Sequence, residues 1–338
     1  MLKRILHYTV PAAATVFFLY LALRHVNLQE VGSALYNTSP LMLLLTLAMA
    51  VMSIAIRAWR WQQLLKPLRR VTYPESFAYS MIGFMANNVL PAHAGEFVKT
   101  AFLARREKVP FSSVLATVIL ERIFDVMALV VLLVTFLLSY PVPGWLKSGG
   151  SMVSLAIFLL VSILMFSTHQ DNWLKKLLLK ISAMLPEKLS EIVGRQIHGF
   201  FAGLEIFSSR KVLVEQFLVS LLLWLQISAT VFIIYRLFPL SGLTSWEMLL
   251  ASGITIVILA FAIVLPSSPG YFGVMQLAFV VALKLFGIRE TDAVACSIIF
   301  NLTQYLPITV LGLLFLFKEG LSLQDLRTTA EKKNETAD

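Results

Sequence analysis

Three ionisable residues fall within five positions of one apolar run. Glu121, Arg122 and Asp125 lie in the middle of residues 112–138, which are otherwise almost entirely apolar. On a helix, residues three or four positions apart share a face, so Asp125 can meet both Arg122 and Glu121. An arginine side chain binds phosphate through two parallel hydrogen bonds. The cluster therefore predicts either an anion-binding site in a membrane or an ion pair that only holds helices together.

A second group of polar side chains interrupts another apolar stretch, between residues 87 and 99. Its members are Asn87, Asn88, His93, Glu96 and Lys99. Such residues are costly at membrane depth unless they face a cavity or one another, so we predict a substrate site. For Glu96 the alternative is an N-terminal cap of a helix, and for His93 it is a structural hydrogen bond. No ligands with metal-binding spacing accompany His93, and we expect neither a metal nor a cofactor.

A short repeat gives these polar residues their setting. Residues 89–97 and 264–272 are identical at five of nine positions, and each places proline and glycine inside an apolar run. Both residues break helices, and broken backbone at membrane depth must line a cavity or be buried in protein. Paired breaks in corresponding halves are typical of a transporter site, although two ordinary proline kinks would leave the same pattern. The tip residues we assign to the site are Pro91, Gly95, Pro266, Ser267, Ser268, Pro269 and Gly270.

The second half contributes polar but uncharged residues. Gln276 follows the second tip, and Asn301 and Gln304 lie on the last span. Helices that restart near Glu96 and Tyr271 would point free N–H groups at the centre of the protein, which suits a phosphate headgroup. We therefore expect an asymmetric anion site, with its charges on the first half.

Composition indicates an integral membrane protein. Hydrophobic residues make up 58% of the 338 residues, charged residues 14%, and the mean hydropathy is +0.80. The net charge of +9 is then better explained by topology signals and anionic lipid contacts than by nucleic acid. A single cysteine excludes disulfides within the chain.

The apolar segments form two sets of four, each in the order span, span, broken element, span. They lie at about 5–23, 40–56, 76–104, 112–138, 151–168, 212–235, 246–286 and 293–317. We expect one membrane domain, residues 1–318, built as a tandem duplication with repeat one at about 5–138 and repeat two at about 151–317. Residues 169–211 are predicted to be an amphipathic cytoplasmic connector, and residues 319–338 a disordered cytoplasmic tail. The first run lacks a cleavage site and is expected to remain as a helix.

The distribution of lysine and arginine distinguishes two topologies, because these residues favour the cytoplasmic side. If both broken elements return to the side they entered, 21 basic residues lie inside and 5 outside; if both cross, each side holds 13. We therefore predict an all-α fold with six full transmembrane helices, two re-entrant helical hairpins and both termini cytoplasmic. Three crossings per half make this an inverted repeat in the plasma (inner) membrane.

These motifs resemble the lysylphosphatidylglycerol synthase transmembrane, or flippase-like, family over nearly the whole chain. The resemblance rests on residues 87–91 with Gly95-Glu96, on residues 120–125, and on residues 265–266 with 268–274. The family often carries arginine where this chain has His93. The resemblance implies translocation of a lipid or lipid-linked group. Family members that synthesise aminoacyl lipids append a soluble transferase domain, which we do not expect here.

We therefore expect a flippase or scramblase for an anionic phospholipid or lipid-linked headgroup. One alternative is an ion-coupled transporter of small solutes, in which Glu96 and Asp125 would carry protons. The other, which rests on the resemblance, is a non-catalytic partner of a membrane glycosyltransferase or polyprenyl-phosphate pathway. A homo-oligomer is a further expected partner arrangement. No nucleophile with a base or nucleotide loop is apparent, so we do not expect an enzyme.

Overall fold

The computed structural model describes residues 20, 23, 26, 28–36, 38–90, 94–142, 144–169, 173–203, 210–238, 240, 242–263 and 269–320, and within them all regular structure is helical. Most of the predicted first span lies outside the described residues. So do all of the tail beyond Gly320 and five predicted site residues: Pro91, His93, Pro266, Ser267 and Ser268.

Within the described residues, five helices are long and apolar enough to cross a bilayer, which makes the chain a multi-pass membrane protein. Four of them coincide with predicted spans: α3 (Pro40–Leu65), α6 (Phe111–Ser139), α10 (Arg210–Leu237) and α13 (Glu290–Lys318). The fifth is α11 (Ser245–Ala262), the first part of the second broken element.

Helices end where the sequence predicts breaks. The first broken element divides into α4 (Tyr73–Val89) and α5 (Gly95–Glu107), and the second into α11, the short 3₁₀ turn η2 (Pro269–Tyr271) and α12 (Val274–Lys284). The remaining helices of the described residues are α2 (Leu28–Tyr36), α7 (Gly144–His169), α8 (Trp173–Ser182) and α9 (Glu187–Gly203).

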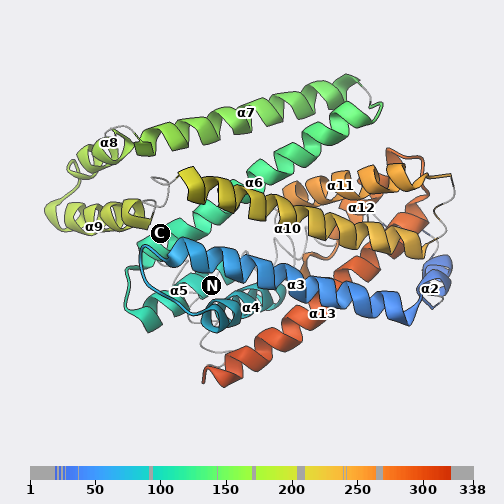
Figure 1. Cartoon of the computed structure of the whole chain (residues 1–338), viewed down its shortest axis with the longest axis horizontal. Helices are drawn as coiled ribbons and strands as arrows, with labels where there is room; N and C mark the ends of the chain where they lie inside the picture. The colour runs from blue at the N-terminus through green and yellow to red at the C-terminus, as the bar shows by residue number, and fades with distance from the viewer. Residues whose placement is uncertain are drawn as a thin grey trace.

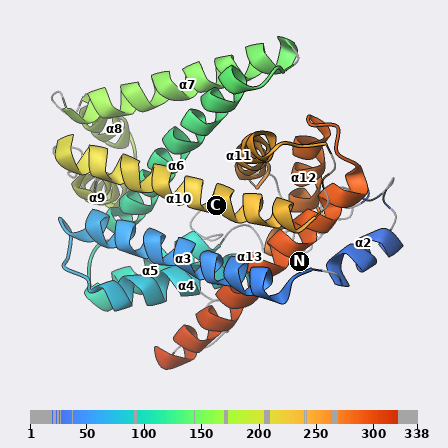
Figure 2. The ribbon, with the colours of Figure 1, turned by 45° about the vertical axis from the view of Figure 1, so that its right-hand side comes forward.

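The helices of the two halves interlock. α3 packs along α10, α4 packs on α13, and α11 packs on α6 (Figure 1). α7 contacts α6 and stands apart from the other long helices in both views, with α8 and α9 at one end of it (Figure 2). The first helix of each broken element is therefore held by the last helix of the other half.

The first helices of the two broken elements begin with the same device, a capping box. Glu75 accepts hydrogen bonds from the Thr72 backbone N–H at 3.0 Å and from its hydroxyl at 2.7 Å. Glu247 does the same for Thr244, at 2.9 and 2.8 Å. These bonds favour the ionised carboxylates, and they lower the pKa of Glu75. Both helix starts therefore satisfy N–H groups that have no intrahelical partner.

Ion pairs join the end of α5 to the beginning of α4. Arg106 lies 3.9 Å from Glu75 and also pairs with Glu319, just after α13, while Arg69 contacts Glu107 at 3.2 Å. The end of α5 therefore lies beside the start of α4.

Helix α3 corrects one predicted boundary. It continues to Leu65 rather than ending at residue 56, and it buries Arg57 and Arg60, which the charge count had placed in a cytoplasmic loop. The helix continues because carboxylates on α6 pair with both arginines. Without them the count becomes 19 inside and 5 outside for returning elements, against 11 and 13 for crossing elements.

Candidate functional site

Asp125 on α6 is the centre of a buried charge cluster. Its carboxylate accepts hydrogen bonds from Arg57 at 3.1 Å and Arg60 at 2.5 Å, both on α3, and from the Trp224 indole N–H of α10 at 3.1 Å. Arg122, one turn away, is a fourth donor at 3.4 Å. Because Asp125 is buried and surrounded by donors, it ties three helices together.

A second ion pair lies beside this one. Glu121 accepts a hydrogen bond from Lys99 Nζ of α5 at 2.6 Å and a longer one from Arg60 at 3.4 Å. The Lys99 ammonium also lies 4.2 Å from the centre of the Trp61 ring, a cation–π distance. Both ionised side chains are buried and paired, so this pair joins α5 to α6.

Arg122 differs from the other cations of the cluster because it is partly accessible. Its side chain is 39% exposed, against 10% for Arg57 and none for Arg60. It pairs with Glu96 in the first turn of α5, and its Nε has no hydrogen-bond partner in the described part of the chain. Arg122 is therefore the cation best placed to bind a ligand.

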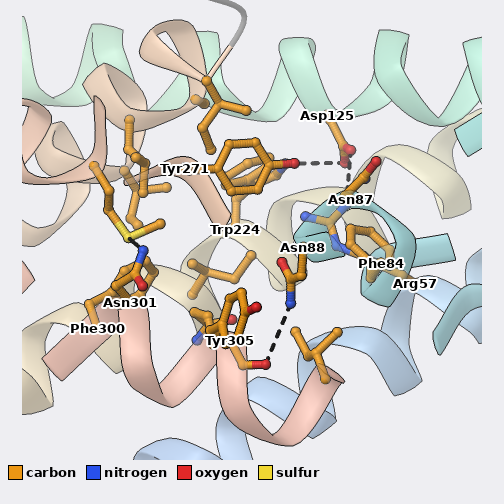
Figure 3. A pocket seen from close by; sticks show the side chains of 18 of the residues that line it. Arg57, Phe84, Asn87, Asn88, Asp125, Trp224, Tyr271, Phe300, Asn301 and Tyr305 are labelled. Carbon is orange, nitrogen blue, oxygen red and sulfur yellow. Dashed lines mark hydrogen bonds and ion pairs between the residues drawn. The ribbon is translucent and has the colours of Figure 1, made fainter. Parts of the chain in front are cut away.

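Arg122 faces a cavity of about 490 Å³ formed by residues of both halves. In Figure 3, Asp125 and Arg57 lie on one side of this cavity, and Asn301 and Phe300 lie on the other. Apolar side chains of α10, of α11 with its C-cap residue and of α12 complete the wall, namely Ile227, Ile256, Leu259, Ala260, Ile263 and Met275. The cavity thus combines charged groups with a hydrocarbon surface.

The first tip is held by the asparagine pair of α4. Asn87 Oδ1 accepts a hydrogen bond from Gly95 N at 2.7 Å, and Asn88 Nδ2 donates to Thr309 Oγ1 of α13 at 2.9 Å. A Cβ added at Gly95 would lie 1.9 Å from the Gly83 carbonyl oxygen, so only glycine allows α5 to begin here.

We expect Gly95→Ala to lower the free energy of unfolding by about 3 kcal/mol, because the clash is with backbone that must shift. Thermal unfolding in detergent measures this. The matched control is Gly194→Ala in α9, where an added Cβ meets nothing within 4 Å and the helix gains propensity. Equal stability of the two variants would contradict the close approach.

The second tip has strained backbone and its own asparagine. Asn301 Nδ2 donates to the Gly270 carbonyl at 2.9 Å. Gly270, Tyr271 and Gly273 all have positive φ, of 77°, 61° and 85°. For Tyr271, which is not glycine, this left-handed backbone conformation costs about 1–3 kcal/mol, and such strain is typical of functional sites.

The cavity brings together eight residues that the sequence assigned to the site: Asn87, Asn88, Glu96, Arg122, Asp125, Gly270, Asn301 and Gln304. Four other predicted site residues do not line the cavity but contact residues next to it. The Gly95 N–H donates to the Asn87 side chain, Gln276 Oε1 accepts from Gly273 N at 2.7 Å, and Lys99 and Glu121 pair with each other. Pro269 lies in η2 and is not among the lining residues.

Sequence reasoning missed the residues supplied by α3 and α10: Arg57, Arg60 and Trp224. The balance of charges in the sequence could have indicated Arg57 and Arg60. The first half offered three intramembrane carboxylates but only Lys99 and Arg122 to balance them. Nothing local pointed to Trp224. Among the described residues, no group of three or more His, Cys, Asp or Glu side chains has an arrangement that could hold a metal ion.

The chain is similar to several known proteins over most of its length. A UPF0104 membrane protein of Methanocaldococcus jannaschii is 22% identical over 316 residues, which cover 90% of this chain and 92% of that protein. One of Pyrococcus horikoshii is 27% identical over 296 residues, covering 82% and 86%. Glycosyltransferase AglD of Haloferax volcanii is 24% identical over 344 residues, covering 88% of this chain and 52% of that protein.

The family whose model matches is described as the lysylphosphatidylglycerol synthase TM region, and the match extends over residues 8–312. This range includes both tips, the α6 charge cluster and the cavity residues of α13. The chain therefore belongs to the lysylphosphatidylglycerol synthase TM region family.

Proposed function

We propose that this protein translocates a lipid, or a lipid-linked molecule, with an anionic headgroup across the bilayer. The observation that carries the proposal is the cavity, which places the accessible Arg122 guanidinium beside a wall of apolar side chains. A phosphate-bearing headgroup matches the first feature, and the start of an acyl or polyprenyl chain matches the second. A transporter of this kind performs no covalent chemistry, so the proposal does not assign an enzymatic activity.

The proposed topology is an inverted repeat in one membrane domain, with α4–α5 and α11–α12 as re-entrant hairpins and both termini in the cytoplasm. Three observations support it: the matching capping boxes, the ion pairs that join α5 to the start of α4, and the cross-packing of α4 on α13 and α11 on α6. The bias of basic residues further supports a cytoplasmic membrane location.

In the proposed mechanism, the headgroup binds between the two tips while its tails stay in lipid. Arg122 supplies the charged hydrogen bonds to phosphate, and the side-chain amide of Gln304, which also lines the cavity, offers neutral ones. Movement of one tip relative to the other then exposes the cavity to each leaflet in turn.

Translocation in proteoliposomes tests the proposal directly. Vesicles hold the purified full-length chain and a trace of fluorescent phospholipid, and external dithionite destroys only the fluorophores of the outer leaflet. We expect the protein to raise the quenched fraction above the half seen in protein-free vesicles, and more for anionic than for zwitterionic headgroups. Quenching equal to that of empty vesicles, for phospholipid and for polyprenyl phosphate probes alike, would overturn the proposal.

A second candidate function is supported by one of the relatives. The likeness to glycosyltransferase AglD fits a role as membrane partner of a glycosyltransferase. The same vesicles separate the two, because a protein that acts only through a partner does not translocate lipid when it is reconstituted alone.

A further inference from the structure

The position on Arg122 that a ligand would need is already taken by a carboxylate of the protein. Glu96 contacts Arg122 Nη2, and the two side chains are 36% and 39% exposed. The other carboxylate near Arg122, Asp125, has a side chain only 3% exposed and is held by three further donors. Of the two, Glu96 is the one that can leave.

We propose that Glu96 is a built-in competitor of the transported anion, and that a phosphodiester group binds Arg122 by displacing it. The inference rests on the proposed function and adds how the same site is regulated. A guanidinium presents one fork of N–H donors, and carboxylate and phosphate occupy it in the same bidentate manner. The Arg122 Nε is buried and has no hydrogen-bond partner among the described residues, so it is a donor that Glu96 leaves unused.

Two ion pairs join α5 to α6. In one of them α5 supplies the carboxylate, and in the other it supplies the cation. Displacement of Glu96 by a ligand therefore has a defined structural consequence. The Glu96–Arg122 pair is half-exposed at the start of α5, and the Lys99–Glu121 pair, one turn further on, is buried at 2.6 Å. A ligand opens the first pair and leaves the second closed. The first turn of α5 then loses its ion pair to α6 and stays bonded to α4 through Gly95 and Asn87, while Lys99 keeps the helix attached to α6.

A released Glu96 is not left without stabilisation. It lies in the first turn of α5, where the helix dipole favours a negative charge. The competition also keeps affinity moderate, as transport requires, because a ligand must leave the site as well as enter it.

Binding rather than transport tests this inference. Calorimetric titration of the full-length protein in detergent uses two probes with the shared phosphate chemistry, dioctanoyl phosphatidylglycerol and inorganic phosphate. We expect Glu96→Gln to bind about three- to fivefold more tightly than wild type, since a half-exposed ion pair contributes little. Tighter binding of both probes assigns recognition to phosphate alone, and tighter binding of only the lipid assigns it to the whole headgroup.

Glu107→Gln is the matched control, because Glu107 is a carboxylate of the same helix, paired with Arg69 away from the cavity. It should bind like wild type. Glu96→Ala extends the test, since a glutamine oxygen can still accept from Arg122; it should bind at least as tightly as Glu96→Gln. Size-exclusion profiles and unfolding temperatures confirm that each variant is folded.

Two results would overturn the inference in distinguishable ways. Unchanged or weaker binding by both folded Glu96 variants, with wild-type binding and translocation intact, removes the competitor and leaves the proposed function standing. Absence of wild-type binding to either probe, together with absence of translocation, removes both.

Discussion

Replacement of Asp125 with alanine is expected to lower the free energy of unfolding by about 3–5 kcal/mol, the cost of removing one partner from a buried ion pair. The variant leaves Arg57 and Arg60 without their shortest ion-pair contact, inside a helix long enough to span the membrane. It also removes the acceptor of the Trp224 indole. Thermal unfolding in detergent, with yield of monodisperse protein as a second readout, measures the effect.

Asp292→Ala provides the comparison, because Asp292 also pairs with an arginine three positions away, the exposed N-cap residue Arg289 of α13. We expect little change there, since surface ion pairs contribute little. If the Asp125 variant proved as stable as the Asp292 variant, the buried cluster would not be what ties α3, α6 and α10 together.

The second large effect concerns transport. Arg122→Ala should reduce lipid translocation at least tenfold, because charge-assisted hydrogen bonds to the headgroup contribute about 1.5–3 kcal/mol and each 1.4 kcal/mol is a factor of ten. The protein should remain folded, since Arg122 is partly exposed and Asp125 keeps its three other donors.

Glu96→Gln should also slow transport, because the tighter-bound headgroup leaves more slowly. The dithionite assay measures both rates.

Two further variants define what Arg122 supplies. Arg122→Lys keeps the charge but loses the planar fork, so an intermediate rate is expected. Arg289→Ala removes an exposed arginine whose partners are Asp292 and Glu30, away from the cavity, and should transport like wild type. Wild-type rates for Arg122→Ala would remove this residue from the site.

The helices and the position of the site follow from local patterns in the sequence. Apolar runs place α3, α6, α10 and α13, and proline with glycine marks where α4 and α11 end, because these signals depend on neighbours in the chain. The α6 charges could be predicted for the same reason, since a charge within an apolar run requires a partner wherever the run lies.

The partners of those charges could not be predicted in the same way. Arg60 meets Asp125 across 65 positions, and Trp224 meets it across 99, so no local pattern links them. Gln276 shows a different kind of difficulty, in which the residue was identified but its role was not. Its polarity indicated a ligand contact, but its side chain instead accepts a hydrogen bond from Gly273, whose N–H begins α12. This bond spans three positions, so the spacing of a capping box could have indicated it from the sequence.

The arginines of α3 have a consequence for the biogenesis of the protein. Arg57 and Arg60 leave the ribosome about 60 residues before the α6 carboxylates that neutralise them. An arginine at the centre of an inserting helix costs about 2.5–3.5 kcal/mol on translocon scales, so the later half of α3 enters lipid at a disadvantage when it is alone. Stable insertion of α3 therefore depends on the later arrival of α6, and a nascent chain truncated before residue 121 should expose the end of α3 to modification from the aqueous side.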